Sequence, residues 1–160
     1  MKLDVFNDKA EAIRYIRENV PDCRTALAAE IYLAQHLPKE SYYQEKIIKY
    51  IQKEYGEDAV VWKEAAGPYS QQGIPDVTVV LNGRYYGFEV KRPYIGILSK
   101  IQEQTIKRIR RAGGIAEVVS FPKDVAAVID RSNRGGFDYD RATRSENEEH
   151  FLQPDSGKQT

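Results

Sequence analysis

The chain has 160 residues, 41% hydrophobic and 30% charged, and its 24 Lys and Arg balance its 24 Asp and Glu. This composition excludes a disordered chain and a membrane protein, and the length suits one domain with its own core. A single cysteine excludes an internal disulfide and a thiolate metal cluster, so any metal would have oxygen ligands, as Mg²⁺, Mn²⁺ and Ca²⁺ prefer. With no long apolar run and no signal-like N-terminus, we expect a cytoplasmic protein.

Residues 1–40 carry helical signals. Apolar residues first recur at three- and four-residue intervals, at Ala10, Ile13, Ile16 and Val20. A second apolar, helix-compatible stretch covers residues 26–37 and is closed by Pro38. We therefore expect an N-terminal helical extension, 1–40, packed on the core that follows.

The next segment predicts a helix, a strand and a loop. Ser41 is the expected N-cap, with Gln44 as its capping-box partner, for a helix that ends near Tyr55. Residues 60–62 are β-branched or aromatic and predict a short strand. The Gly, Pro, Ser and Gln of residues 66–73 predict a loop suited to substrate contacts.

Two runs rich in β-branched and aromatic residues, 76–81 and 84–91, flank Asn82-Gly83, which strongly predicts a β-hairpin. With a two-residue turn, Asp76 lies directly opposite Glu89. Because side chains alternate between the two faces, one face is apolar and must be core, comprising Val77, Val79, Leu81, Tyr86, Phe88 and Val90. The other face carries Asp76, Thr78, Gly87, Glu89 and Lys91.

Two carboxylates opposite each other, with β-carbons about 5 Å apart, repel and destabilise a hairpin. A hard divalent cation between Asp76 and Glu89 would remove this repulsion. Lys91, on the same face, would orient a nucleophilic water or stabilise charge that develops on a phosphate.

A helix is expected from about Ser99 to Ala112. Its apolar stripe contains Leu98, Ile101, Thr105, Ile106, Ile109 and Ala112. Gln102 projects from the middle of that stripe, where a polar side chain needs a partner, whereas Gln104 points away. We therefore expect Gln102 to reach the carboxylate and lysine cluster and orient it.

The C-terminal part begins with a predicted strand over 115–120. Residues 125–129 form a short apolar element of undetermined type, and 131–160 contain too few apolar residues to fold, so we expect a disordered tail there. These observations place the core at 41–130.

Four motifs together resemble the PD-(D/E)xK nuclease superfamily. They are Gly73-Ile-Pro-Asp76, Gly87-Phe-Glu-Val-Lys91, Ser99-Lys-Ile-Gln102 and Ala112-Gly-Gly114. Within that superfamily the sequence is similar to the VRR-NUC type, found as stand-alone phage or bacterial proteins and as domains of DNA-repair nucleases. The resemblance covers about residues 41–120, and Glu45 and Lys63 match a helix glutamate and a lysine of the family.

This resemblance implies a restriction-endonuclease-like α/β fold, a mixed sheet flanked by helices. It also implies DNA hydrolysis that depends on one or two Mg²⁺ or Mn²⁺ ions, and a homodimer. Asp76, Glu89, Glu45 and the Val90 carbonyl would hold the metal.

Basic residues cluster after the hairpin and indicate a weak DNA-binding surface. They are Arg92, Lys100, Lys107, Arg108 and Arg111, with Lys63 before the hairpin. The sequence thus predicts a structure-selective DNA endonuclease. A Holliday-junction resolvase, a restriction-type endonuclease and a non-catalytic DNA-binding or assembly module remain alternatives, because one scaffold hosts many functions.

Overall fold

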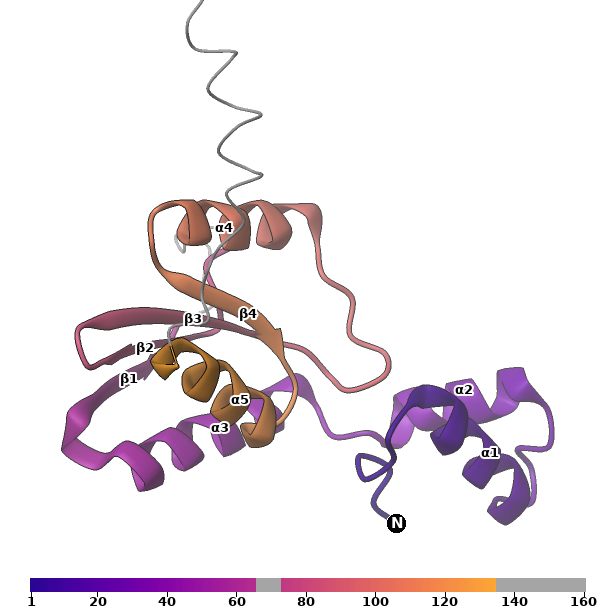
Figure 1. The fold of residues 1–160 in the computed structure, drawn as a ribbon. Coiled ribbons are helices and arrows are strands. Elements are labelled where there is room, and N and C mark those ends of the chain that lie inside the picture. The colour runs from indigo at the N-terminus through magenta and orange to yellow at the C-terminus, as the bar shows by residue number, and fades with distance from the viewer. Residues whose placement is uncertain (66–72, 135–160) are drawn as a thin grey trace, which may run out of the picture. The chain divides into compact units, whose positions relative to one another are not determined.

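A computed structural model describes residues 1–65 and 73–134 of the chain. The chain divides into two compact units, Met1–Ala127 and Val128–Thr160. In chain order the elements are α1 (Lys9–Asn19), α2 (Ala26–His36), α3 (Glu40–Tyr55), the short 3₁₀ helix η1 (Gly56–Asp58), β1 (Ala59–Lys63), β2 (Val77–Leu81), β3 (Arg84–Val90), α4 (Lys100–Arg111), β4 (Ile115–Val119) and α5 (Pro122–Asn133) (Figure 1). In the described residues, no helix combines the length and apolar character needed to cross a membrane.

The four strands form one mixed sheet in the order β1-β2-β3-β4. β1 with β2 and β2 with β3 are antiparallel pairs, whereas β3 and β4 are parallel. α3 lies on one face of the sheet and α4 on the other (Figure 1). This is the expected α/β class, a mixed sheet flanked by helices with a helical N-terminal part.

The hairpin of β2 and β3 has the predicted register, with Leu81 opposite Arg84 and Val77 opposite Phe88. Asn82 and Gly83 both adopt positive φ, 51° and 74°, as the tight turn requires. All six residues of the predicted apolar face are at most 1% exposed. This face is therefore core.

The N-terminal helices have a hydrophobic cluster of their own. Asp8 caps α1 and Thr25 caps α2 through side-chain oxygens. The buried members of the cluster are Leu3, Ala12, Ile16, Cys23, Ala29, Leu33 and Leu37. Tyr94 and Ile95, which follow β3 in the chain, pack against this cluster.

The start of α3 differs from the prediction. The helix begins one residue before Ser41, Lys39 occupies the N-cap position, and no side chain caps the helix. Gln44 is only 6% exposed, because it lies on the buried face of the helix and does not serve as a capping partner. Burial decided the orientation of this helix, and the capping pattern did not.

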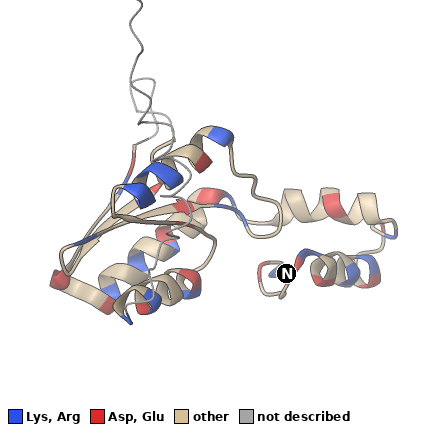
Figure 2. Cartoon of the chain, turned by 45° about the horizontal axis from the view of Figure 1, so that its top comes forward, with Lys and Arg blue, Asp and Glu red and all other residues tan. Residues whose placement is uncertain are grey.

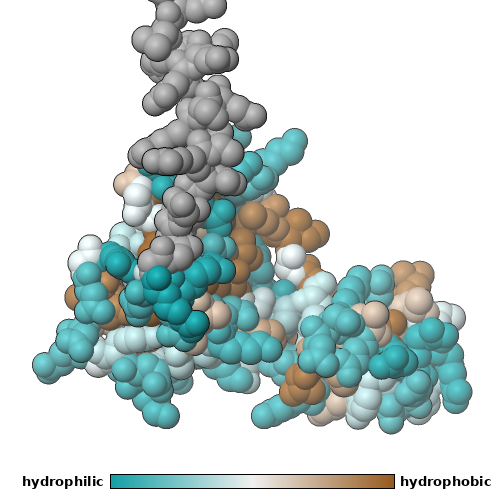
Figure 3. Space-filling model, in the orientation of Figure 1, coloured by the Kyte–Doolittle hydropathy of each residue, from teal (hydrophilic) through white to brown (hydrophobic). Residues whose placement is uncertain are grey.

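The apolar stripe of α4 is less buried than predicted. Ile106 is 5% exposed, but Ile101 is 47% exposed and Ala112 is also exposed. The helix contacts β3 and β4, and its residues Ile101 and Thr105 also lie close to Gly73. The surface of the described residues is mainly hydrophilic, with apolar areas exposed between the hydrophilic ones (Figure 3).

The element of undetermined type at 125–129 is part of helix α5. Because α5 continues to Asn133, residues 131–133 of the expected disordered tail are helical. Residues 135–160 of that tail, and residues 66–72 of the expected loop, lie outside the described residues.

Candidate active site

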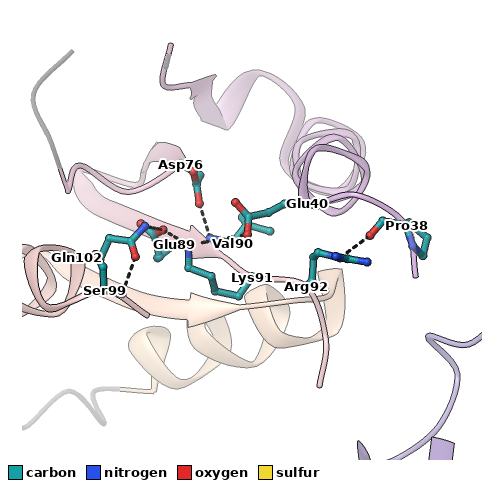
Figure 4. Close-up of polar contacts among 9 residues, drawn as sticks. All are labelled: Pro38, Glu40, Asp76, Glu89, Val90, Lys91, Arg92, Ser99 and Gln102. Atoms are coloured by element: carbon teal, nitrogen blue, oxygen red, sulfur yellow. Dashed lines mark hydrogen bonds and ion pairs between the residues drawn. The ribbon is translucent and has the colours of Figure 1, made fainter. Parts of the chain in front are cut away.

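The polar face of the hairpin brings Asp76, Glu89 and Lys91 together at the end where β2 begins and β3 ends (Figure 4). Asp76 Oδ2 accepts a hydrogen bond of 2.8 Å from the main-chain N–H of Val90. This bond ties the Asp76 side chain to the neighbouring strand. The carboxylate is thus positioned by the backbone of the element that carries Glu89.

Glu89 is a buried carboxylate with unequal oxygens. Its Oε1 accepts a 2.7 Å hydrogen bond from Lys91 Nζ and another from Gln102 Nε2, whereas its buried Oε2 has no hydrogen-bond partner among the described residues. Burial and the neighbouring Asp76 charge raise the pKa of Glu89 to about 7, against the lowering effect of Lys91. An ionisable group in this environment is typical of a functional site.

Gln102 reaches this cluster from the first turn of α4. Its Oε1 accepts a 2.9 Å bond from the main-chain N–H of Ser99, and Ser99 Oγ accepts a 3.3 Å bond from the N–H of Gln102. This reciprocal capping box fixes the side chain, so that its amide nitrogen donates to Glu89. Gln102 therefore both completes the capping box at the start of α4 and orients the Glu89 carboxylate.

Lys91 forms ion pairs with two acidic residues, Glu89 and Glu40. Beyond its bond to Glu89, its Nζ lies 3.9 Å from Oε2 of Glu40, the first residue of α3. Burial alone would lower the pKa of Lys91, but the hydrogen bond and charge of Glu89, with the charges of Glu40 and Asp76, raise it. Burial also raises the pKa of Glu40. Glu40 could not be identified from the sequence, because no local pattern distinguishes it from the other acids of α3.

Glu45 is not brought to this cluster. It lies on an exposed part of α3. Within residues 1–65 and 73–134, no three acidic, His or Cys side chains are placed to share a metal ion, so Glu45 does not complete a ligand set with Asp76 and Glu89. Glu40 is the α3 acid beside the cluster.

The donor set fits a hard divalent cation held by few protein ligands. Mg²⁺ is commonly bound by one or two carboxylates, with water and phosphate oxygens completing its octahedron. Asp76 and Glu89 supply two carboxylates, and the unpartnered Glu89 Oε2 is an oxygen with capacity to bind a cation. Their chemistry therefore suits Mg²⁺ or Mn²⁺.

Most of the basic residues considered for DNA binding are exposed. Lys and Arg lie along α4, where Lys100, Lys107, Arg108 and Arg111 are exposed (Figure 2). Lys107 also forms a 2.8 Å ion pair with Glu103 on the same helix. Lys63, at the end of β1, is exposed as well.

Arg92 differs from these exposed residues, because its guanidinium is bound within the protein. Its guanidinium donates to three main-chain carbonyls at the end of α2 and just beyond it, those of Ala34, Leu37 and Pro38, at 2.7, 2.8 and 3.0 Å. Cationic side chains satisfy the carbonyls that a helix leaves unpaired at its C-terminus. These three hydrogen bonds tie the Arg92 side chain to the C-terminal end of α2, and its predicted contact with DNA stays a prediction.

Comparisons with known proteins find similarity among solved structures. No family model matches the chain, and no curated protein matches it. Among solved structures, a chain described as a VRR_NUC domain is similar, with 26% sequence identity and a TM-score of 0.44. The similarity covers 55% of this chain and 95% of that chain. The description names the family whose motifs the sequence resembles.

Proposed function

We propose that this protein is a divalent-metal-dependent deoxyribonuclease of the VRR-NUC kind, which hydrolyses phosphodiester bonds in DNA. One observation carries the proposal. Two carboxylates, Asp76 and Glu89, lie at one end of the hairpin with the Lys91 ammonium bound to Glu89. Lys91 and Gln102 both donate to Oε1 of Glu89, so the buried Oε2 has no hydrogen-bond donor among the described residues, and a bound cation would satisfy it.

Each residue has a role in this proposal. Asp76, Glu89 and the Val90 carbonyl would hold one or two Mg²⁺ or Mn²⁺ ions. Such ions lower the pKa of a bound water and neutralise phosphate charge. Lys91, an ammonium at neutral pH, orients the attacking water and stabilises the charge that develops on the phosphate. Gln102 positions Glu89 through its amide nitrogen.

The basic face of α4 supports DNA as the substrate. Lys100, Arg108 and Arg111 are exposed on the helix that also carries Gln102. Cationic side chains beside a phosphodiesterase site would follow the nucleic-acid backbone. A homodimer that binds both strands of a structured DNA belongs to the same proposal.

The replacement of Lys91 by alanine tests the proposal. The wild-type chain is incubated with single-stranded, flap, four-way-junction and duplex DNA in Mg²⁺ and in Mn²⁺. Lys91→Ala is expected to reduce cleavage by about 10³-fold or more, because it removes the charge that stabilises the transition state. DNA binding, measured by fluorescence anisotropy, stays within a few fold. Full cleavage activity in this variant would contradict the catalytic role of Lys91.

Calorimetric titration with Mn²⁺ provides the control. The wild-type chain is expected to bind Mn²⁺, Asp76→Ala to lose that binding, and Glu45→Ala to retain it. If the wild-type chain binds DNA but neither binds Mn²⁺ nor cleaves, the result contradicts the nuclease proposal and favours a non-catalytic DNA-binding module.

A further inference from the structure

The sheet face that carries Glu89 also carries exposed apolar side chains on β1 and β2. α4 contacts β3 and β4 on this face, and Val60, Trp62 and Val80 remain 61%, 41% and 38% exposed. Val60 lies opposite Val80, and Trp62 lies opposite Thr78. Together Val60, Trp62 and Val80 form an apolar shelf on the polar-site side of the sheet.

The indole of Trp62 is held by Glu64, which directly follows β1. Trp62 Nε1 donates a 2.7 Å hydrogen bond to Glu64 Oε1, which also accepts a 3.4 Å bond from Thr78 Oγ1. The main-chain N–H of Glu64 donates to the Asp76 carbonyl at 2.9 Å. An aromatic ring fixed in this way loses little freedom on binding, which favours affinity.

The register places this ring near Asp76. Trp62 pairs with Thr78, and Asp76 precedes Thr78 by two positions on the same face. Diagonal neighbours of this kind lie about 7–8 Å apart. That distance spans roughly two nucleotides of a stacked strand, which rises about 3.4 Å per nucleotide. A strand whose phosphate lies at Asp76 can therefore place a base near Trp62.

We propose that Trp62 is a stacking platform for an unpaired base close to the scissile phosphate. This rests on the proposed function and deepens it, because it assigns a substrate class, DNA with a single-stranded segment at the cleavage position. The face of a paired base inside a duplex is covered by its neighbours, whereas an unpaired base is free to stack. The Glu64 carboxylate disfavours a phosphate at this place, so the shelf suits a neutral base.

Intrinsic fluorescence tests this directly, because Trp62 is the only tryptophan in the chain. The full chain is titrated with an oligothymidylate, a blunt duplex and a flap duplex in EDTA, where no metal-dependent cleavage occurs. The oligothymidylate and the flap duplex are expected to quench the tryptophan in a saturable manner, and the blunt duplex is not. Equal quenching by the blunt duplex would overturn the proposal, as would binding of single-stranded DNA without a change in fluorescence.

Variants measure the size of the effect. Trp62→Ala is expected to weaken binding of single-stranded DNA by about 5- to 150-fold, the range for loss of one stacked base, and binding of blunt duplex by less than about twofold. Trp62→Phe keeps an aromatic face and most of the affinity. Leu27→Ala, which shortens an exposed apolar side chain on α2 outside the shelf, is the matched control and changes affinity little. Equal losses for both DNAs, or none, contradict the proposal.

The outcomes separate this inference from the proposed function. If the wild-type chain cleaves DNA but the Trp62 variants retain wild-type affinity and preference, only the inference fails. If it neither binds nor cleaves any DNA, the proposed function fails as well. A second copy of the chain is the other possible occupant of the shelf. If a second copy covers the shelf, the tryptophan emission will shift with protein concentration in the absence of DNA. That result would overturn the stacking role of Trp62.

Discussion

Residues of the β2–β3 hairpin alternate between its two faces, and the two faces differ in chemistry. One is apolar, and the other carries charged side chains. On one face the six apolar residues from Val77 to Val90 are at most 1% exposed and stabilise the fold. On the other, Glu89 is equally buried at 1%, but it is a carboxylate whose Oε2 has no partner among the described residues. Burial of a charge costs free energy unless it is paired. The apolar face therefore stabilises the fold, whereas the polar face carries the buried carboxylate on which the proposed chemistry depends.

The largest expected effect on stability comes from the apolar face. Phe88→Ala removes a fully buried ring and should lower the free energy of unfolding by about 3–5 kcal/mol. Urea denaturation followed by circular dichroism measures this, and cleavage is then normalised to the folded fraction. Activity per folded molecule should be close to wild type. If the variant is folded and stable but inactive, the two faces are not separable.

The division between these faces could be predicted because it follows from local chemistry. Asn82-Gly83 favours the positive φ values of a two-residue turn, and that turn fixes the register. Once the register is fixed, the pleat assigns each residue to a face. The proximity of Asp76 and Glu89 therefore needed no knowledge of the rest of the fold.

An intermediate effect is expected on the polar face from Gln102→Leu. The change removes the hydrogen bond to Glu89 and half of the capping box, so cleavage should fall by about 10- to 100-fold and stability by about 1–2 kcal/mol. Initial cleavage rates and thermal denaturation measure the two effects.

Two controls separate the positioning of Glu89 from helix stability. Ser99→Ala removes the capping partner but keeps the Glu89 contact, so it should lower stability by about 1 kcal/mol and leave cleavage nearly unchanged. Gln104→Leu, at an exposed position on the same helix, should change neither quantity much. A loss of cleavage in Ser99→Ala as large as in Gln102→Leu would show that the amide acts only through the helix.

Contacts between distant elements could not be predicted in the same way. The choice between Glu40 and Glu45 depends on how α3 is rotated and placed against the sheet, which follows from the burial of Tyr43, Ile47 and Ile51. The role of Arg92 depends on where α2 ends relative to the segment after β3. Both are set by packing between elements, so local spacing carries no signal for them.

The smallest expected effect distinguishes the two α3 acids. Glu40→Gln removes a charge 3.9 Å from the Lys91 ammonium in a pair that is partly exposed. Because such pairs are weak, cleavage should fall by roughly 2- to 10-fold, and Glu45→Gln should be indistinguishable from wild type. Initial rates on one flap substrate at low and moderate salt measure both variants, and the Glu40 effect should shrink as salt rises. A larger loss of cleavage in Glu45→Gln than in Glu40→Gln would contradict this expectation. It would favour Glu45, the residue that the sequence resemblance implies.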